Sequence, residues 1–336
     1  MDKRKINLIQ ENLDKNEILL VLNNYNLFYL TGINLDGYSL AISKNKIKIL
    51  TSLMIFGQVK KFFKDIEIVV GSDLEQQISK LNFVNKILLI DDKNLSLKIY
   101  DLLKKCSKII KFSSLIENFR MIKSKNEIDK IKKSVEICKK VLNKTKEFIK
   151  PQITEVEVKN FILKQFLDYK VETAFPPIVA FDENTSYPHH ISTNKRFKKN
   201  SLVLIDLGCK YRGYCCDITR MFNVEKNTKV KDLYIKLKDL QRILISMCKP
   251  SVKVKDIDNY ARNYFKKLNL EKNYLHSTGH GLGLEIHELP KITIKNDVVL
   301  QENMVVTIEP GIYFNRKFGL RIEDDIVVNY ETEILT

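Results

Sequence analysis

The strongest constraint on the fold is an internal repeat in the second part of the chain. The segment KPQITEVEV at 150–158 returns as KPSVKVKDI at 249–257, which is 99 residues later. Each copy closes one predicted helix and opens the next. The helix before the first copy starts at a capping box formed by Ser124 and Glu127, and the helix before the second copy covers about 230–249.

An apolar strand with one acidic residue follows each copy. These strands are LVLIDLG at 202–208 and VVTIEPG at 305–311, and their acidic residues, Asp206 and Glu309, are 103 residues apart. The small difference between the two offsets is ordinary drift in loop length between copies of one unit. The sequence therefore predicts two similar α+β halves, each of which presents a carboxylate from an apolar strand.

The chain of 336 residues is long enough to carry a second, smaller domain before this one. Between residues 18 and 115, short apolar runs such as 18–21 and 87–90 alternate with helix-like stretches such as 58–63 and 95–103. This alternation is typical of an α/β domain with a partly parallel sheet. The charged segment 117–125 separates the two parts. We therefore predict an α+β protein with a small α/β domain over 1–118 and a duplicated domain over 119–336.

Composition indicates an ordinary globular protein of the cytoplasm, with 44% hydrophobic and 29% charged residues. No apolar run approaches the roughly 18 to 20 residues that span a bilayer, and the N-terminal segment lacks the apolar region of a secretory signal. We therefore expect no membrane partner. The net charge of +16 comes from lysines spread through nearly every segment, without a basic stripe of interleaved aromatics, so we also expect no nucleic-acid partner.

The six cysteines are too few for a disulfide framework in a chain of this length. We expect them to be small buried hydrophobic residues. Cys215 and Cys216 are adjacent, and adjacent strand residues point to opposite faces, so this pair is not expected to bind one zinc ion.

Asp206 lies in an apolar run, where an unpaired carboxylate would cost several kcal/mol. Taken alone, it would be explained by a structural salt bridge to a lysine or arginine. Asp217, however, lies after Asp206 on the returning side of a short predicted hairpin, so the two carboxylates flank its turn. With Tyr211 and Arg212 at the tip, Asp217 would pair directly with Asp206, with Cβ atoms about 4.5 to 5.5 Å apart. A three-residue loop closed by Gly213 would give another register. Like charges so close repel each other unless a cation lies between them.

The second half repeats this arrangement, because Glu309 precedes a turn at 315–319 and Glu323 lies on the returning strand. All five histidines lie between residues 189 and 287 of the same domain. Four carboxylates and one imidazole form an oxygen-rich set that suits two divalent ions bridged by carboxylates and a hydroxide. Manganese or cobalt fits such ligands better than zinc does. A bridging hydroxide is a nucleophile at neutral pH, which indicates a hydrolase.

Five segments resemble, in the same order, the motifs of the pita-bread metallopeptidases, and among these the Xaa-Pro aminopeptidases and prolidases. They are FPPIVAFDENTSYPHH, LVLIDLGCKYRGYCCDITRMF, HSTGHGLGLEIHELP, MVVTIEPGIYF and GLRIEDDIVV. NLFYLTG at 26–32 resembles the family's small domain, and MIKSKNEIDKIKKS at 121–134 resembles the start of its catalytic domain. The resemblance implies a creatinase-like N-terminal domain followed by a pita-bread catalytic domain with an internal pseudo-twofold duplication.

Carried over by position, the resemblance implies five metal ligands, which are Asp206, Asp217, His280, Glu309 and Glu323. Asp217 and Glu323 would bridge the two ions. Glu309 would also shuttle a proton, first as general base and then as general acid.

The resemblance also implies that His189 and His287 contact the scissile carbonyl and the substrate. The residues expected to support them are His276, Tyr313 and Arg321. His190 is expected to be structural, and Thr219 is expected to hold a metal ligand in place.

The implied activity is metal-dependent hydrolysis of the Xaa-Pro bond, at the N-terminus of peptides or in dipeptides, by a hydroxide that bridges two divalent ions. Manganese is the preferred metal, with cobalt or zinc as alternatives. Short proline-containing peptides are the expected partners. The family favours a homodimer in which the small domain helps to close the neighbouring site.

The chain has Thr-Ser-Leu-Met at 51–54, where many aminopeptidases of this branch carry Asp-Gly-Arg-Tyr, and this departure favours a prolidase. A methionine aminopeptidase, or a broader aminopeptidase, is the main alternative, although methionine aminopeptidases resemble only the second domain. A creatinase-like hydrolase would differ at the metal positions. A non-enzymatic binding module of the same fold would have lost the ligands, and all five are present.

Overall fold

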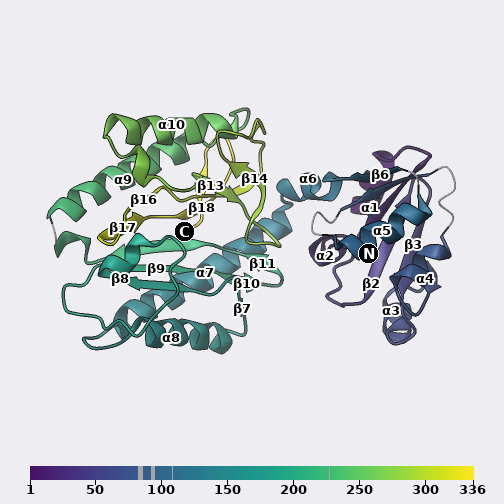
Figure 1. The fold of residues 1–336 in the computed structure, drawn as a ribbon, viewed down its shortest axis with the longest axis horizontal. Coiled ribbons are helices and arrows are strands. Elements are labelled where there is room, and N and C mark those ends of the chain that lie inside the picture. Colours follow the sequence, from purple (N-terminus) through teal and green to yellow (C-terminus); the bar gives the residue numbers. More distant parts are fainter. Residues whose placement is uncertain (82–85, 92–94, 108, 227) are drawn as a thin grey trace. The chain divides into compact units, whose positions relative to one another are not determined.

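The computed structural model describes residues 1–81, 86–91, 95–107, 109–226 and 228–336 (Figure 1). The chain divides into two compact units, Met1–Arg120 and Met121–Thr336. In the part of the chain described, no helix combines the length and the apolar character needed to cross a membrane.

Unit 1 is built on a six-stranded sheet with the order β4-β3-β2-β1-β5-β6. Its strands are β1 (Glu17–Val21), β2 (Tyr38–Ser43), β3 (Lys46–Thr51), β4 (Glu67–Val70), β5 (Ile87–Ile90) and β6 (Ile109–Phe112). The pairs β1–β5, β3–β4 and β5–β6 are parallel, and the pairs β1–β2 and β2–β3 are antiparallel. The predicted small α/β domain with a partly parallel sheet is confirmed.

The helices of unit 1 alternate with these strands. They are α1 (Lys3–Glu11), α2 (Asn24–Thr31), α3 (Phe56–Phe62), α4 (Leu74–Ser79), α5 (Leu97–Cys106) and α6 (Leu115–Met121). The helices predicted at 58–63 and 95–103 correspond to α3 and α5, each of which begins two residues from its predicted start. The charged segment 117–125 is not an irregular connection, because α6 occupies its first residues and buries Ile116 and Arg120.

Alternation along β1 shows why the sheet of unit 1 is apolar on both faces. Leu19 and Val21 join an apolar cluster that includes residues of α1 and α2, whereas Leu20 joins a cluster with Ile78 of α4 and Leu103 of α5. A strand buried on both faces must carry a continuous apolar run, as EILLV does.

A buried polar network ties β5 to α2 and α6 inside unit 1. The Asp91 carboxylate accepts hydrogen bonds from the Leu22 N–H at 2.8 Å and from the Asn26 amide at 3.0 Å. The Asn26 carbonyl oxygen accepts from the Arg120 guanidinium at 2.8 Å, and its amide also donates to Glu117 at 3.0 Å. Burial, the largest cause, raises the pKa of Asp91 to about 7.

Unit 2 consists of two halves of similar design. The first half contains α7 (Lys125–Phe148), α8 (Glu155–Asp168), β7 (Glu172–Thr173), β8 (Ile178–Phe181), β9 (Val203–Leu207), β10 (Cys209–Tyr211), β11 (Tyr214–Cys215) and β12 (Ile218–Phe222). The second half contains α9 (Thr228–Met247), α10 (Val254–Lys267), β13 (Gly279–Gly281), β14 (Glu288–Ile292), β15 (Val305–Ile308), β16 (Gly311–Phe314), β17 (Phe318–Arg321), β18 (Asp324–Val327) and β19 (Glu333–Ile334). Each half places a helix pair before its sheets, so the predicted duplication is confirmed.

The helix pairs lie on the outside of unit 2 and the strands between them (Figure 1). One sheet has the order β12-β9-β8 and the other has the order β14-β13-β15-β18-β19. Capping boxes start the first pair of helices: the predicted box of Ser124 with Glu127 begins α7, and a box of Thr154 with Glu157 begins α8. Such boxes satisfy N–H groups that the first turn would otherwise leave unpaired.

Strand β9 separates two apolar cores. Val203 and Ile205 belong to the core that contains residues of α7 and α8, whereas Leu204 belongs to the core that contains residues of α9 and α10. Because strand side chains alternate between faces, Asp206 continues the row of Leu204 on the inner face of the sheet. The carboxylate thus lies where an apolar row between the two halves ends.

The first hairpin has a different register from the one predicted. Its tip is Arg212-Gly213, with φ angles of 50° and 86°, and Asp206 pairs with Thr219 rather than with Asp217. Two left-handed residues in succession form the type of tight turn that suits the twist of a hairpin, and glycine adopts it at little cost. The tip is one residue later than predicted, so the register moves by two residues and Asp217 stays on the face of Asp206.

The raised pKa of Asp91 predicts how the stability of unit 1 depends on pH. The folded carboxyl holds its proton up to about pH 7, whereas an unfolded aspartate loses its proton near pH 3.9. Between these values the folded state binds more protons, so stability decreases as the pH rises and levels off above about 7. We expect the melting temperature of unit 1 to fall between about pH 4 and pH 7. Asp91→Asn should remove this part of the dependence, and an unchanged slope in thermal unfolding of Asp91→Asn would contradict the assignment.

Candidate metal centre

A single pocket of about 560 Å³ in unit 2 gathers the residues that the sequence singled out. Nine of the ten predicted site residues line it, namely His189, Asp206, Asp217, His276, His280, His287, Glu309, Arg321 and Glu323. The tenth, Tyr313, does not line the pocket. Its hydroxyl forms hydrogen bonds with two residues that do, His276 and Arg321. The fold therefore brings together predicted site residues that are up to 134 positions apart along the chain.

The four carboxylates come from the two central hairpins. Asp206 lies in β9, Asp217 directly precedes β12, Glu309 directly follows β15, and Glu323 lies between β17 and β18. The pairs β15–β18 and β16–β17 keep one common register, and that register, continued between them, sets Glu309 opposite Glu323. An isolated bridge between Thr219 and Glu323 joins the hairpin of the first half to that of the second.

Oxygen and nitrogen atoms of three buried residues lie close enough to share one ion. Ligand atoms of Asp217, His280 and Glu323 are all within 4.8 Å of one another. The His280 Nε2 atom is 3.8 Å from Asp217 Oδ2 and 3.5 Å from Glu309 Oε1. These separations are those expected of atoms that surround a cation without touching each other.

Burial makes this collection of negative charge unfavourable. Burial and the neighbouring carboxylates raise the pKa of Asp217 and of Glu323 well above the usual range, and burial raises the pKa of Glu309 to about 8. In the described part of the chain, Asp206 Oδ1 and Asp217 Oδ1 are buried without a hydrogen-bond partner. Unpaired buried carboxylate oxygens are rare in folded proteins, so the donor set fits divalent cations.

The His280 ring is oriented as a ligand. Its Nδ1–H can donate to the Gly281 carbonyl oxygen at 3.1 Å, which leaves the Nε2 lone pair facing the carboxylates. Burial lowers the pKa of His280 to about 3, so the imidazole is neutral. A neutral imidazole with its other nitrogen hydrogen-bonded to a carbonyl is the usual form of a metal-ligating histidine.

Neighbouring polar groups hold the carboxylates in place. The Thr219 hydroxyl donates to Glu323 at 2.7 Å, as expected for the residue predicted to support a ligand. The Arg321 guanidinium donates to Asp206 Oδ2 at 2.6 Å, and the Asp325 carboxylate accepts from the Asp217 N–H at 2.9 Å. Among the described residues, Arg321 donates a hydrogen bond to only one of the four carboxylates, and its single positive charge cannot balance all four.

A hydrogen-bonded chain runs behind Glu309. Arg321 donates to the Tyr313 hydroxyl at 2.8 Å, and that hydroxyl can donate to His276 Nε2 at 2.9 Å. The His276 Nδ1–H can then donate to the Ser277 carbonyl oxygen at 2.9 Å, with Glu309 at 3.9 Å from the same nitrogen. Burial lowers the pKa of His276 to about 4, so this ring too is neutral. The three residues predicted to be supporting thus form one connected group.

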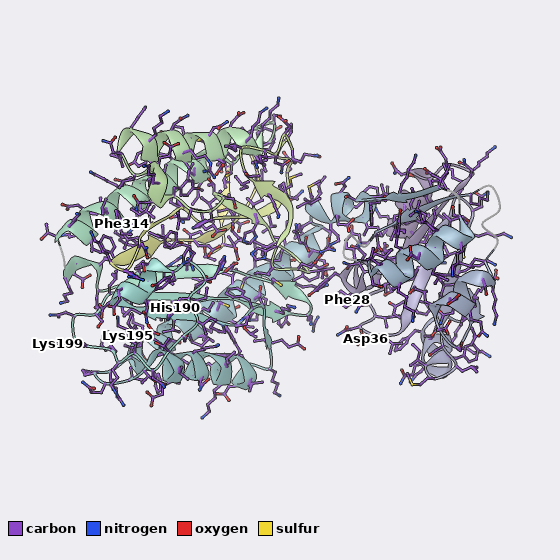
Figure 2. All side chains as sticks on the ribbon, in the orientation of Figure 1. Phe28, Asp36, His190, Lys195, Lys199 and Phe314 are labelled. Atoms are coloured by element: carbon purple, nitrogen blue, oxygen red, sulfur yellow. The ribbon has the colours of Figure 1, made fainter. Side chains whose placement is uncertain are left out.

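The remaining histidines differ in their surroundings. The rings of His287 and His280 meet edge to face with centroids 4.4 Å apart, and burial lowers the pKa of His287. His189 lines the pocket next to Pro188, whose carbonyl oxygen accepts from Arg321 at 3.2 Å. His190, labelled in Figure 2, is instead hydrogen-bonded to the buried Glu155 of α8 at 2.8 Å, in agreement with its predicted structural role.

The sequence did not single out the two lysines that line the pocket, Lys159 of α8 and Lys291 of β14. Lys291 is the register partner of His280 across β13 and β14, so its side chain starts beside one of the predicted metal ligands. With 57 lysines and arginines in the chain, neither lysine stands out from the composition. Only the strand pairing distinguishes Lys291.

Comparison with known proteins places both units. The model of metallopeptidase family M24 matches residues 129–330, and the model of the creatinase/prolidase N-terminal domain matches residues 6–122. A Mycoplasma genitalium protein, whose name proposes it to be a Xaa-Pro aminopeptidase, is 31% identical over 341 residues, which cover 99% of this chain and 96% of that protein.

Solved structures agree with this placement. The Xaa-Pro dipeptidase from Bacillus anthracis is 29% identical with a TM-score of 0.91, over 99% of this chain and 97% of that one. The prolidase from Pyrococcus horikoshii OT3 is 31% identical with a TM-score of 0.91, over 99% of this chain and 98% of that one. The catalytic model covers more than half of the chain, and the pocket with its acidic ligands lies inside the matched range. The chain therefore belongs to metallopeptidase family M24, with a creatinase/prolidase N-terminal domain before its catalytic domain.

Proposed function

We propose that this chain hydrolyses the peptide bond before proline and uses two divalent metal ions to do so. The observation that carries the proposal is the convergence of three buried carboxylates, the partly buried carboxylate of Glu309 and one neutral imidazole on one pocket, with two carboxylate oxygens left without a partner among the described residues. Structural relatives that match over nearly the whole chain are named as a Xaa-Pro dipeptidase and a prolidase.

Asp206, Asp217, His280, Glu309 and Glu323 would hold the ions, with Asp217 and Glu323 shared between them. Four carboxylates against one imidazole favour manganese or cobalt over zinc. Bound divalent ions would activate water for attack at neutral pH and polarise the scissile carbonyl. Proton transfer and substrate binding would be carried out by side chains of this pocket.

Glu309 would move the proton. Without metal, burial raises the pKa of its carboxyl to about 8, and bound cations would lower that pKa, so the group could both accept a proton and return it near neutral pH. The chain through His276, Tyr313 and Arg321 fixes the surroundings of this carboxyl. His189 and His287 line the same pocket, where their ring nitrogens would bind the carbonyl oxygen and orient the substrate.

The test is a small panel of peptides. The protein is freed of metal by chelation, reloaded with manganese, cobalt or zinc, and assayed on Ala-Pro, Ala-Pro-Ala and Met-Ala-Ser. We expect cleavage of the proline peptides with metal and none without it. Efficient release of methionine from Met-Ala-Ser, with neither proline peptide cleaved under any metal, would instead assign a methionine aminopeptidase.

One observation favours dipeptides as substrates. The ammonium groups of Lys159 and Lys291 line the pocket, and neither forms an ion pair or hydrogen bond within the described residues. A dipeptide brings its C-terminal carboxylate into the pocket together with the scissile bond. Lys291 starts beside His280 and is therefore the better placed of the two cations to bind that carboxylate.

Replacing Lys291 by methionine tests this assignment. Lys291→Met should raise KM for Ala-Pro by about fivefold, since an exposed ion pair contributes about 1 kcal/mol, and should leave kcat nearly unchanged. The C-terminal amide of Ala-Pro has no carboxylate and should show no such change. Lys295→Met is the matched control, because Lys295 is equally exposed but does not line the pocket. An equal effect on the acid and the amide would contradict the role.

Two histidine variants separate metal binding from catalysis. His280→Ala should lose at least one ion together with activity, because it removes a ligand. His189→Ala should keep its metal and its fold but turn over about 10² to 10³ times more slowly, as expected when a donor to the developing negative charge is removed. Elemental analysis beside kcat checks both variants. A metal-depleted His189→Ala protein, or one with wild-type turnover, would show that the roles are wrong.

A further inference from the structure

Three cysteines from three separate elements meet in the core of unit 2. Cys138 lies in α7, Cys209 in β10, and Cys216 between β11 and β12. All three are completely buried, with 0% exposure. The sulfur atoms of Cys138 and Cys216 are 3.1 Å apart, and the three sulfur atoms all lie within 4.8 Å of one another. We call these residues the cysteine trio.

The surroundings of the trio are apolar. The three cysteines belong to the same hydrophobic core as residues of α7 and α8. Cys209 donates to the Ser134 carbonyl oxygen at 3.4 Å, and Cys216 lies 3.8 Å from the Cys209 carbonyl oxygen. Two other buried cysteines, Cys215 and Cys248, each donate to a backbone carbonyl oxygen, and among the described residues neither belongs to a cluster of metal-ligand atoms.

The spacing of the sulfur atoms suits a three-coordinate ion. Metal–thiolate bonds are about 2.3 Å long, which places the sulfurs of a planar three-ligand site about 4.0 Å apart. One separation in the trio is 3.1 Å and none exceeds 4.8 Å, so small side-chain rotations bring the three sulfurs to that spacing. Structural zinc takes four ligands, whereas the described residues place no fourth His, Cys, Asp or Glu ligand atom with the trio, and its complete burial excludes bulk water.

We propose that the cysteine trio binds one soft, thiophilic metal ion of the Cu(I) class, at a site distinct from the carboxylate centre. Soft ions prefer thiolates, whereas manganese and cobalt prefer the oxygen donors of the pocket, so the two sites select different metals. Binding forms metal–sulfur bonds and releases the thiol protons to solvent, without any change in oxidation state.

One member of the trio is the sequence neighbour of a residue that we assign to the carboxylate centre. Cys216 precedes Asp217, whose N–H donates to Asp325. An ion that draws Cys216 toward α7 therefore acts on the backbone of a residue that we assign to the carboxylate centre. Loading of the trio is therefore measured by metal uptake itself rather than through peptide cleavage.

Competition for copper tests the proposal on the whole chain. The reduced protein, freed of metal, is titrated anaerobically against Cu(I) held by a coloured chelator, and each point is followed to equilibrium because the thiols are buried. The wild-type chain should take up one Cu(I). Cys209→Ala should weaken this uptake at least tenfold. Cys248→Ala, which removes an equally buried thiol outside the trio, should match the wild type.

A second measurement uses only the wild-type chain, so it tests the proposal even if Cys209→Ala does not fold. X-ray absorption at the copper edge of the loaded wild-type chain should report three sulfur neighbours and no oxygen or nitrogen. Absence of copper uptake by the wild type, oxygen or nitrogen ligation, or equal weakening in Cys248→Ala and a folded Cys209→Ala would each overturn the proposal.

Discussion

Repulsion among four clustered carboxylates, three of them buried, is the constraint on which unit 2 depends. Asp206, Asp217, Glu309 and Glu323 line one pocket, and among the described residues only Arg321 donates a guanidinium hydrogen bond to any of them. Two buried oxygens are left without a hydrogen bond. An arrangement of this kind is costly in an apo protein and becomes favourable only with cations, as expected for a member of a metallopeptidase family.

Each of the two similar halves of unit 2 supplies two of these four carboxylates. Each half ends an apolar strand in a carboxylate and follows it with a hairpin that carries another. Thr219 joins the two hairpins, because it pairs with Asp206 in one half and bonds to Glu323 of the other. Asymmetry enters through single residues: His280 and Arg321 come from the second half alone. The two repeated halves therefore enclose a carboxylate pocket whose surroundings differ from one half to the other.

Much of this could be predicted from the sequence, because apolar strands with one acidic residue and capping boxes are local patterns. The predicted site residues do share a pocket. The hairpin register was wrong because turn geometry depends on which residues adopt left-handed φ angles, and Tyr211-Arg212 and Arg212-Gly213 are both plausible tips by composition. Lys291 and the cysteine trio depend on strand pairing and on the packing of a helix against a sheet, and neither leaves a periodic signal in the sequence.

The alternation along β9 limits how this chain can change in length. Leu204 and Asp206 face inward while Val203 and Ile205 face the helices, so inserting one residue in this strand would exchange the carboxylate for a leucine or isoleucine and bury the charge in an apolar core. Insertions and deletions are therefore tolerable only outside the acidic strands. The two halves already follow this rule, because the four-residue difference between them lies between the start of the second helix and the acidic strand of each half.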